Sequence, residues 1–443
     1  METKTVKLEE VCEIRRGSSP RPISNFISKN SGMPWVKISD ATSTNSKVIS
    51  ETSEFIKLEG VDKSVIVQKG DLILSNSGTA GLPKFMGIQA CIHDGWQVLR
   101  NLKGITSDYL YYSLIYIRSY LLHHAYDSVM KNLTLDMVRN AEVRLPPLSE
   151  QKAIAHILGT LDDKIELNRQ MNETLETMAQ ALFKSWFVDF DPVIDNALLA
   201  GNDIPDDLAE RTELRQAQLD SGQAYTNSDI NDLFPSDFEF TEELGWIPKG
   251  WEVSNINNEF EVTMGQSPPG SSYNEEQEGI AFFQGSTDFG FRYPTNRIYT
   301  TEPKRLADKD DTLVSVRAPV GTVNMATQKC CIGRGLSAVR HKSGNRSYTY
   351  YSMIQLHQRF QVFESEGTVF GSINQKDFKA LLQIKAPDSL INKFEEYAGG
   401  LDNKIETNSL QITTLAKLRD TLLPRLMSGE LRIPDIEKLV EDI

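Results

Sequence analysis

Two stretches of the chain repeat apolar residues in alternating steps of four and three, the spacing of a heptad stripe. The first stretch, residues 148–190, contains two asparagines in the stripe, and the second, residues 388–427, has one breach at Arg419. The stripe positions are Ile154, Leu158, Leu161, Ile165, Asn168, Asn172, Leu175, Ala179 and Leu182, then Phe394, Ala398, Leu401, Ile405, Asn408, Ile412, Leu415 and Leu422. We predict two long helices, with Pro424 as the stop signal of the second.

A single apolar stripe on a long helix must be buried against a partner. Because both stripes lie in one chain, we predict that the two helices pair with each other as an antiparallel coiled coil. Asn168 and Asn408 occupy the same place in the two stripes. Such asparagines are either solvated or fix the register of the pair, and both interpretations stay open here.

The segments before the two helices, residues 1–147 and 251–387, have a different pattern. Short apolar runs alternate with glycine, asparagine and serine, which is typical of strands and turns. Examples are Val65–Val67, Asp71–Ser75 and Gln97–Leu99, whereas Tyr109–Tyr120 has helical spacing. We predict that each segment is a mixed α/β domain.

The two halves of the chain resemble each other at an offset of about 240 residues. Leu161–Asn168 and Leu401–Asn408 are identical at six of eight positions, and Lys69–Ser75 resembles Lys309–Ser315. The offset is far larger than the roughly 20 to 50 residues of a solenoid repeat, so we infer that a whole domain with its helix was duplicated. The predicted fold class is mixed α+β: two tandem, similar α/β domains joined by two long helices, with an internal pseudo-two-fold axis and a tail at 428–443.

Charge is distributed unevenly along the chain. The 443 residues carry 47 basic and 61 acidic side chains, a formal net charge of −14. Residues 148–250 alone contain 21 acidic and 7 basic side chains, whereas the two domains are slightly basic. Charge is informative about partners only domain by domain, so the acidic total does not exclude a nucleic acid. We interpret residues 191–250 as an acidic linker, with a contact surface for a partner protein as the alternative.

The composition argues against several classes of protein. No apolar run approaches the roughly 20 residues of a membrane span, and the first residues lack an apolar signal region, so we expect a cytoplasmic protein. The four cysteines and six histidines lack the spacing of metal ligands, so we predict neither a disulfide framework nor a metal site. Phosphate-binding loops, dinucleotide-binding turns and nucleophile elbows are also missing.

Two short motifs resemble parts of DNA-modifying enzymes. Ser267–Gly270 reads Ser-Pro-Pro-Gly, without the aromatic residue with which a methyltransferase would grip a flipped base. Asp162-Asp163-Lys164 has the D-x-K form of a two-metal nuclease, but it lies on the predicted helix without a Pro-Asp element upstream. We interpret this motif as a solvated helix face and predict no catalytic residue in the chain.

Loops of both domains contain arginine, asparagine, serine and lysine side chains. Arginine and asparagine read guanine and adenine edges in the major groove, whereas serine and lysine mostly bind phosphates. Taken one at a time, such a residue is more often a solvated surface residue than a DNA contact. The predicted DNA contacts are Arg15, Arg16, Arg21, Ser75, Asn76, Lys131, Asn132, Gln266, Arg292, Arg297, Arg317 and Arg334.

Three stretches resemble the DNA specificity subunits of type I restriction–modification enzymes. They are Leu145–Ile154 leading into Leu161–Ile165, Ala181–Pro192 followed by Glu243–Val253, and Leu422–Leu431. Ser315–Gly321 and Cys331–Leu336 are similar to the second recognition domain of this family. The resemblance extends over essentially the whole chain.

This resemblance implies two target recognition domains, 1–147 and 251–387, each reading one half of a bipartite double-stranded DNA site. The helices 148–190 and 388–427 would set the spacing of the half-sites and dock two modification (methyltransferase) subunits. S-adenosylmethionine, ATP and Mg²⁺ would belong to the methyltransferase and restriction subunits, and this chain would hold no cofactor. The residues expected in the helix seam or the docking surface are Leu161, Ile165, Asn168, Leu175, Phe183, Trp186, Phe187, Leu401, Ile405, Asn408 and Leu415.

Some alternatives stay open. The aromatic residues Phe183, Trp186 and Phe187 are expected in the core at the helix end, with docking of a methyltransferase as the second interpretation. The whole chain could instead be a fragment of a single-chain methyltransferase or nuclease, which would methylate or cut DNA unaided. It could also be a coiled-coil scaffold, whose complex would bind random and cognate duplexes equally.

Overall fold

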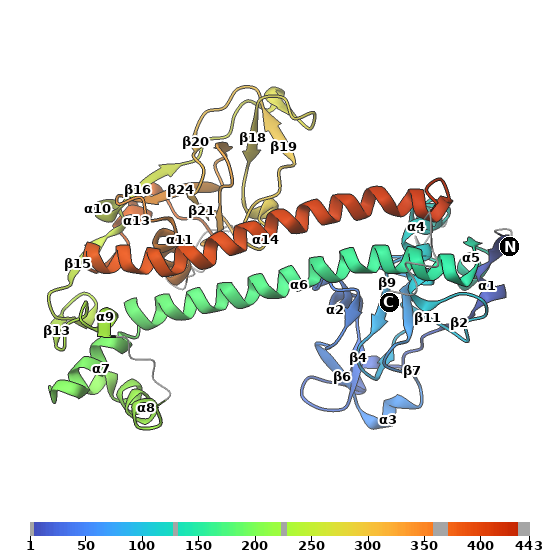
Figure 1. Cartoon of the computed structure of the whole chain (residues 1–443), viewed down its shortest axis with the longest axis horizontal. Coiled ribbons are helices and arrows are strands. Elements are labelled where there is room, and N and C mark those ends of the chain that lie inside the picture. Colours follow the sequence, from blue (N-terminus) through green and yellow to red (C-terminus); the bar gives the residue numbers. More distant parts are fainter. Residues whose placement is uncertain (1–3, 127–131, 223–227, 358–370, 433–443) are drawn as a thin grey trace. The chain divides into compact units, whose positions relative to one another are not determined.

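The computed structural model of the chain describes residues 4–126, 132–222, 228–357 and 371–432 (Figure 1). The chain divides into two compact units. Unit 1 consists of residues 1–170 and 408–443, and unit 2 is the continuous stretch 171–407. The long helices α6 (Leu148–Phe187) and α14 (Asp388–Ser428) each contribute one part to either unit.

Domain 1 (residues 1–147) lies in unit 1 and contains three sheets. Their strand orders are β3–β6–β4–β10–β7, β2–β11–β8–β9–β5 and β1–β12. The strands are β1 (Lys4–Lys7), β2 (Glu13–Arg16), β3 (Ile27–Ser28), β4 (Met33–Val36), β5 (Val48–Ile49), β6 (Glu54–Ile56), β7 (Val65–Val67), β8 (Leu72–Ser75), β9 (Pro83–Met86), β10 (Ala90–Ile92), β11 (Trp96–Arg100) and β12 (Glu142–Leu145). The helices are α1 (Leu8–Val11), α2 (Ile38–Thr42), α3 (Leu58–Val61), α4 (Ser107–Tyr126) and α5 (Leu135–Arg139).

Domain 2 (residues 251–387) lies in unit 2 and repeats this topology. Its strand orders are β17–β19–β18–β23–β20, β16–β24–β21–β22 and β15–β25, so that only a counterpart of β5 is missing among the described residues. The strands are β15 (Glu252–Asn255), β16 (Phe260–Met264), β17 (Tyr273–Asn274), β18 (Ile280–Phe283), β19 (Ile298–Thr300), β20 (Leu306–Ala307), β21 (Thr312–Ser315), β22 (Val323–Met325), β23 (Cys330–Ile332), β24 (Leu336–His341) and β25 (Leu382–Lys385). The helices are α10 (Ile256–Glu259), α11 (Arg346–Gln355) and α13 (Gln375–Ala380). The duplication predicted from the sequence is therefore a duplication of topology.

The central strands are apolar because both of their faces are covered. In β8, Leu72 and Leu74 belong to a cluster shared with α4 and the long helices, whereas Ile73 belongs to the cluster between the two large sheets. Alternate side chains of a strand point to opposite faces, so a strand between a helix layer and a sheet layer must be apolar at every position. In β21, Val314 and Leu313 divide between the two clusters of domain 2 in the same way.

In unit 1, the two long helices run antiparallel. Asp162 Oδ1 of α6 accepts a hydrogen bond from Arg419 Nη1 of α14 at 2.7 Å, and Asn168 Nδ2 donates to Gln411 Oε1 at 3.1 Å. Residue numbers thus rise along α6 as they fall along α14, which confirms the predicted direction. The ends of both helices complete the core of domain 1, to which they contribute Ile154, Leu158, Leu426 and Met427.

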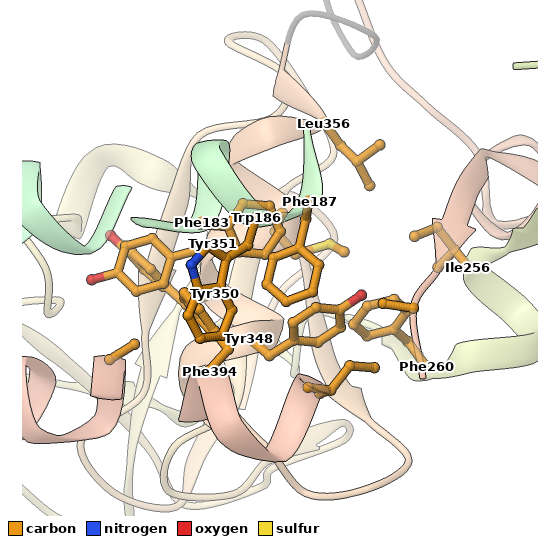
Figure 2. Packing of buried hydrophobic residues seen from close by; sticks show 14 of the residues in the cluster. Phe183, Trp186, Phe187, Ile256, Phe260, Tyr348, Tyr350, Tyr351, Leu356 and Phe394 are labelled. Atoms are coloured by element: carbon orange, nitrogen blue, oxygen red, sulfur yellow. The ribbon is translucent and has the colours of Figure 1, made fainter. Parts of the chain in front are cut away.

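In unit 2, the helices meet through aromatic side chains (Figure 2). The ring centroids of Phe183 and Trp186 on α6 lie 5.5 Å and 6.0 Å from that of Phe394 on α14. Phe183, Trp186 and Phe187 are buried in the core of domain 2 together with Tyr348. The structure therefore supports the core interpretation of these aromatic residues.

The second helix does not stop at Pro424, contrary to the prediction. It continues to Ser428 with the proline inside its last turns. A proline lacks one amide donor, and near the end of a helix this loss concerns a single hydrogen bond. Leu426 and Met427, which follow the proline, are buried in domain 1 and hold the last turn in place.

The acidic segment between the domains is folded rather than a solvated linker. It forms α7 (Asp191–Ala200), α8 (Ala209–Asp220), α9 (Ser228–Asn231) and the paired strands β13 (Phe238–Thr241) and β14 (Gly245–Pro248). Arg211 Nε and Nη2 donate to the two carboxylate oxygens of Asp191, each at 2.6 Å, and Arg215 Nε donates to Asp195 Oδ1 at 2.9 Å. Some of the acidic side chains are thus paired within unit 2.

The described residues contain no helix that is both long and apolar enough to cross a membrane. Over the same ranges, no cluster of three or more His, Cys, Asp or Glu side chains could hold a metal ion. All four cysteines are buried and unbridged. Burial raises the pKa of the Cys12 thiol to about 12, so this thiol is protonated and unreactive at neutral pH.

Candidate nucleic-acid interface

Three predicted arginines come together at one hollow in domain 2. The hollow has a volume of about 240 Å³ and lies where the loops after β18, before β19, after β21 and between β23 and β24 meet. Its lining residues are Gln284, Gly285, Thr287, Asp288, Arg297, Arg317, Arg334 and Gly335. Residues predicted separately as DNA contacts from different loops therefore share one site.

A buried serine shapes the loop that carries Arg317. Ser315 Oγ donates to the carbonyl oxygen of Pro319 at 2.6 Å and accepts from the amide of Thr322 at 2.8 Å. The amide of Gly321 donates to the carbonyl oxygen of Ser315 at 2.8 Å, and its φ of +84° is a conformation that favours glycine. These bonds fix the loop between β21 and β22, so the position of Arg317 at the hollow follows from the framework.

The hollow offers both hydrogen-bond donors and acceptors. Arg297 Nε and Nη2 donate to Asp288 Oδ1 at 3.0 Å and 2.9 Å. Arg317 and Arg334 are exposed, and neither side chain forms an ion pair with another described residue. A phosphate presents acceptors only, whereas base edges present donors as well as acceptors. The Asp288 side chain is only 8 % exposed and is bonded to Arg297, so the accessible acceptor is the exposed amide of Gln284. Guanidinium groups beside an amide that both donates and accepts are better suited to base edges.

The corresponding region of domain 1 is centred on Asp94, in the turn between β10 and β11. Arg16 Nε donates to the carbonyl oxygen of Asp94 at 2.9 Å, and Arg21 Nη2 lies 3.8 Å from its carboxylate Oδ2. Ser19 Oγ donates to Asp94 Oδ1 at 2.8 Å, and this hydrogen bond is the main reason that the pKa of Asp94 lies below its ordinary value. At neutral pH the turn thus presents a carboxylate, which is 45 % exposed and flanked by two arginines.

Close contacts between neighbouring loops show which residues correspond in the two domains. A Cβ placed on Gly17 or on Gly265 would lie 2.1 Å from the carbonyl oxygen of the residue just before Asp94 or just before Arg334, respectively. Only glycine fits so near a neighbouring backbone. Asp94 therefore stands where domain 2 has Arg334, and one domain presents an acceptor where the other presents a donor.

Two predicted DNA contacts of domain 1, Ser75 and Asn76, are wrong because their side chains are buried. Ser75 Oγ donates to the carbonyl oxygen of Thr79 at 2.5 Å and accepts from the amide of Leu82 at 2.9 Å, as Ser315 does in domain 2. Asn76 Nδ2 donates to the carbonyl oxygen of Asp94 at 2.9 Å. Both side chains hold loops in place. A polar residue at a strand end can either hold a loop or contact a ligand, and the sequence does not show which of the two it does.

Arg292 is also wrongly predicted as a DNA contact. Its side chain is fully buried and forms ion pairs with Glu176 of α6 and Asp402 of α14. Its guanidinium group lies 3.6 Å above the ring of Tyr350. Tyr293, the next residue in the chain, packs against the hydrophobic core of unit 2.

The remaining predicted contacts are at or near the surface. Arg15 on β2 and Gln266 after β16 are exposed, and Asn132 is half-buried just before α5. Lys131 lies outside the described residues. These four residues stay predictions.

The repeated Leu-Asp motif, Leu161-Asp162 and Leu401-Asp402, attaches each domain to the helix that follows it. The interpretation of this motif as a solvated helix face is therefore wrong for Asp162. Tyr112 Oη of α4 donates to Asp162 Oδ2 at 2.6 Å, and Tyr351 Oη of α11 donates to Asp402 Oδ1 at 2.8 Å. Burial is the main cause that raises the pKa of both tyrosines, so the hydroxyls remain donors. Asp163, the next residue, is exposed as predicted.

The predicted seam residues line the inner face of the long helices to different degrees. Asn168 is buried and donates to Gln411 of the other helix, a contact compatible with a role in register. Four of the predicted residues are buried, and four are half-buried: Ile165, Asn168, Ile405 and Asn408, then Leu161, Leu175, Leu401 and Leu415. Other apolar side chains of the same helices remain exposed, namely Leu167, Met178, Leu410 and Leu418.

Sequence reasoning missed the acceptors of both regions. Asp288, Gln284 and Thr287 line the hollow of domain 2, and Ser19 and Asp94 form the centre of the domain 1 region. Asp94 precedes Arg334 by 240 residues, the offset of the duplication. A search for polar residues at that offset would have found this pair.

Comparisons with known proteins agree with this architecture. A family model described as the type I restriction modification DNA specificity domain matches residues 1–177 and 248–418. The chain is 25 % identical over 451 residues to the type I restriction enzyme MjaIX specificity subunit of Methanocaldococcus jannaschii, covering 97 % of this chain and 94 % of that protein. It is 27 % identical over 333 residues to the type I restriction enzyme HindI specificity subunit of Haemophilus influenzae, covering 68 % and 71 % of the two chains.

A solved structure shares the fold. The chain resembles the crystal structure of a type I restriction–modification system S subunit from M. genitalium, with a TM-score of 0.58 and 14 % identity over 96 % of each chain. At this level of identity, the likeness concerns the fold alone. It is consistent with the mixed helix and sheet architecture described above.

Proposed function

The chain belongs to the family of type I restriction–modification DNA specificity domains, and from this premise we propose that its two domains read the two halves of a bipartite DNA site. The observation that carries the proposal is the pair of corresponding loop regions, around Arg334 in domain 2 and around Asp94 in domain 1. Arginine forms paired hydrogen bonds with guanine, whereas a carboxylate accepts from cytosine. Because a donor in one domain corresponds to an acceptor in the other, we expect the two half-sites to differ in sequence.

In this proposal the chain supplies specificity and its partners supply the chemistry. Two modification (methyltransferase) subunits would bind S-adenosylmethionine and methylate adenine in the recognised site. Restriction subunits would use ATP and Mg²⁺ to translocate and cut DNA. The absence of a catalytic motif from the sequence is consistent with this division of roles.

We further propose that the long helices set the gap between the half-sites. Helix α6 has 40 residues, and at a rise of 1.5 Å per residue it is about 60 Å long. One turn of DNA is about 34 Å, so helices of this length suit half-sites separated by bases that are not read. The exposed apolar residues Leu167, Met178, Leu410 and Leu418 are the side chains that we assign to methyltransferase docking.

The test is a map of methylated adenines produced by the complex of this chain with its methyltransferase subunits. We expect Arg317→Gln and Arg334→Gln each to reduce methylation of the cognate site by about 5- to 150-fold, the range of one specific base contact, and to relax the preference at one position. Arg305→Gln is the matched control, because Arg305 is exposed in domain 2 outside the hollow. This control should change methylation by less than about twofold.

Other results would contradict the proposal. If Arg334→Gln weakened binding equally on all sequences and made it less sensitive to salt, Arg334 would contact phosphate instead of a base. If the complex bound random and cognate duplexes equally, the chain would be a scaffold rather than a reader of sequence.

A further inference from the structure

Arg292 is the most deeply buried charged side chain of the segment between β18 and β19. Its side chain has no exposed surface. Nη1 donates to Glu176 Oε2 of α6 at 2.8 Å, and Nη2 donates to Asp402 Oδ1 of α14 and to Tyr351 Oη of α11 at 3.1 Å. One guanidinium group thus connects domain 2 with both long helices inside unit 2.

The network is almost closed to solvent, with one guanidinium group between two carboxylates and only the Glu176 side chain 11 % exposed. The guanidinium group stacks on the ring of Tyr350, with 3.6 Å between the guanidinium carbon and the ring centroid. Burial raises the pKa of Glu176, and Arg292 is the cation that offsets its charge. A planar guanidinium group can hold two carboxylates and one ring at once, whereas a lysine ammonium is a point charge without the stacking face.

The same short segment also carries the recognition hollow. Arg297 and Asp288, which line the hollow, lie on either side of Arg292 in the sequence. The carbonyl oxygen of Arg292 accepts from the amide of Met325 on β22 at 2.9 Å, and Asn324 Nδ2 donates to the carbonyl oxygen of Gly290 at 3.0 Å. These bonds join the segment to the sheet of domain 2, so Arg292 connects the domain that carries the hollow to both long helices.

Domain 1 has a counterpart of Arg292 with much weaker contacts. The carbonyl oxygen of Lys47 accepts from the amide of Phe85 on β9 at 2.8 Å, which is the place of Arg292 in the repeat. Lys47 Nζ pairs with Asp163 of α6 at 2.6 Å, but the lysine side chain is 29 % exposed and the aspartate side chain 69 %. Within the described part of the chain, Lys47 thus pairs with one of the two long helices, and this pair is in contact with solvent.

We propose that Arg292 is a positioning residue that fixes the recognition surface of domain 2 to both helices and thereby limits the complex to one gap between half-sites. The inference rests on the proposed function. One added base pair moves a half-site by about 3.4 Å and turns it by about 34° around the DNA axis. A domain locked by a buried network on two helices resists this displacement, whereas a domain held less firmly accommodates it.

The experiment measures methylation by the full complex on duplexes that keep both half-sites and vary the gap by one or two base pairs. Arg292→Lys keeps a positive charge but loses the planar double contact, and Glu176→Gln keeps the shape but removes the ion pair to α6. For both variants we expect the preference for the cognate gap to fall by about tenfold, with the base preference within each half-site unchanged. Lys47→Gln is the matched control and should retain the wild-type gap preference.

The outcomes separate this inference from the proposal on which it rests. If both variants kept the sharp gap preference and only unfolded at a lower temperature, Arg292 would be merely structural and the inference would be wrong. If one variant failed to assemble, the other would decide by the same comparison. If the wild-type complex itself showed no gap preference, the bipartite reading would fail, and the inference would fail with it.

Discussion

Domain 1 and domain 2 have the same topology, but they are attached to the second helix of the pair by different contacts. In each domain, a tyrosine binds the first aspartate of the Leu-Asp motif on its own helix. In unit 1, that aspartate, Asp162, is reached by Arg419 from the other helix, and the arginine side chain is 30 % exposed. In unit 2, the domain itself supplies the fully buried Arg292, which pairs with Asp402 on its own helix and with Glu176 on the other. Both copies of the repeat therefore share the tyrosine–aspartate contact between a domain and the helix that follows it. The contact with the other helix differs between the two copies.

A second comparison separates the framework from the recognition loops. Each domain keeps a buried serine that holds the loop after its central strand, Ser75 or Ser315. By contrast, the turn between β10 and β11 carries the negatively charged Asp94, whereas the corresponding turn between β23 and β24 carries the positively charged Arg334. Residues that hold the loops are thus shared by the domains, and residues that face solvent at the loop ends are not.

The ion pairs of Arg292 in unit 2 and of Lys47 in unit 1 should differ most in how much each stabilises its unit. Arg292→Met leaves Glu176 and Asp402 buried without their cation, which should lower the free energy of unfolding of unit 2 by about 3–5 kcal/mol. Lys47→Met removes a solvent-exposed pair and should cost unit 1 about 0–1 kcal/mol. Native-state hydrogen exchange resolves the two units and provides the measurement.

Equal losses in the two units would contradict this difference between the attachment sites. A double variant, Arg292→Met with Glu176→Gln, sharpens the comparison. Since it removes one of the stranded charges, it should recover part of the stability that Arg292→Met loses.

A smaller and equal effect is expected for the two framework serines. Ser75→Ala and Ser315→Ala each remove a hydroxyl that makes two hydrogen bonds to the backbone of its loop, one as donor and one as acceptor, at a cost of about 1–3 kcal/mol for the two bonds. Hydrogen exchange should increase in residues 76–82 for the first variant and in residues 316–322 for the second. A difference of more than about 1 kcal/mol between the two variants would show that the loops are not equivalent.

The smallest effect on stability is expected on the exposed side of the long helices. Leu167→Asp should change the free energy of unfolding by no more than about 0.5 kcal/mol, because Leu167 is exposed. We expect it to weaken binding of the methyltransferase subunit by at least about fivefold, as measured by titration calorimetry. Ile165→Asp is the contrasting variant, since this buried seam residue should destabilise unit 1 before it affects docking. Unchanged binding by Leu167→Asp would place the docking surface elsewhere.

The sequence predicted the architecture because two strong signals agreed. The heptad spacing requires long helices with a buried stripe, and α6 and α14 are such helices. The offset of about 240 residues requires two similar domains, and the sheets have matching strand orders. The periodicity did not predict that residues 191–250 would fold, because a segment so rich in carboxylates resembles a solvated linker. The sequence does not show that some of these carboxylates pair with arginines, as Asp191 does with Arg211.

The candidate site was predicted less completely. Arg297, Arg317 and Arg334 meet at one hollow, because arginines in loops at neighbouring strand ends of one domain tend to lie near each other. Arg292 and Ser75 have the same residue types as true surface contacts, and only tertiary packing separates them. The acceptor Asp94 was not predicted, because the sequence does not show that this loop carboxylate lies between two arginines.

The division of the chain into a continuous unit 2 and a discontinuous unit 1 has a consequence for biosynthesis. The core of domain 1 includes Leu426 and Met427, which leave the ribosome long after the rest of that domain. Unit 2 contains all of its own core and can finish folding first. Until α14 is made, Ile154 and Leu158 lack part of their cover, so the nascent first domain is the segment with the longest exposure to chaperones and to aggregation.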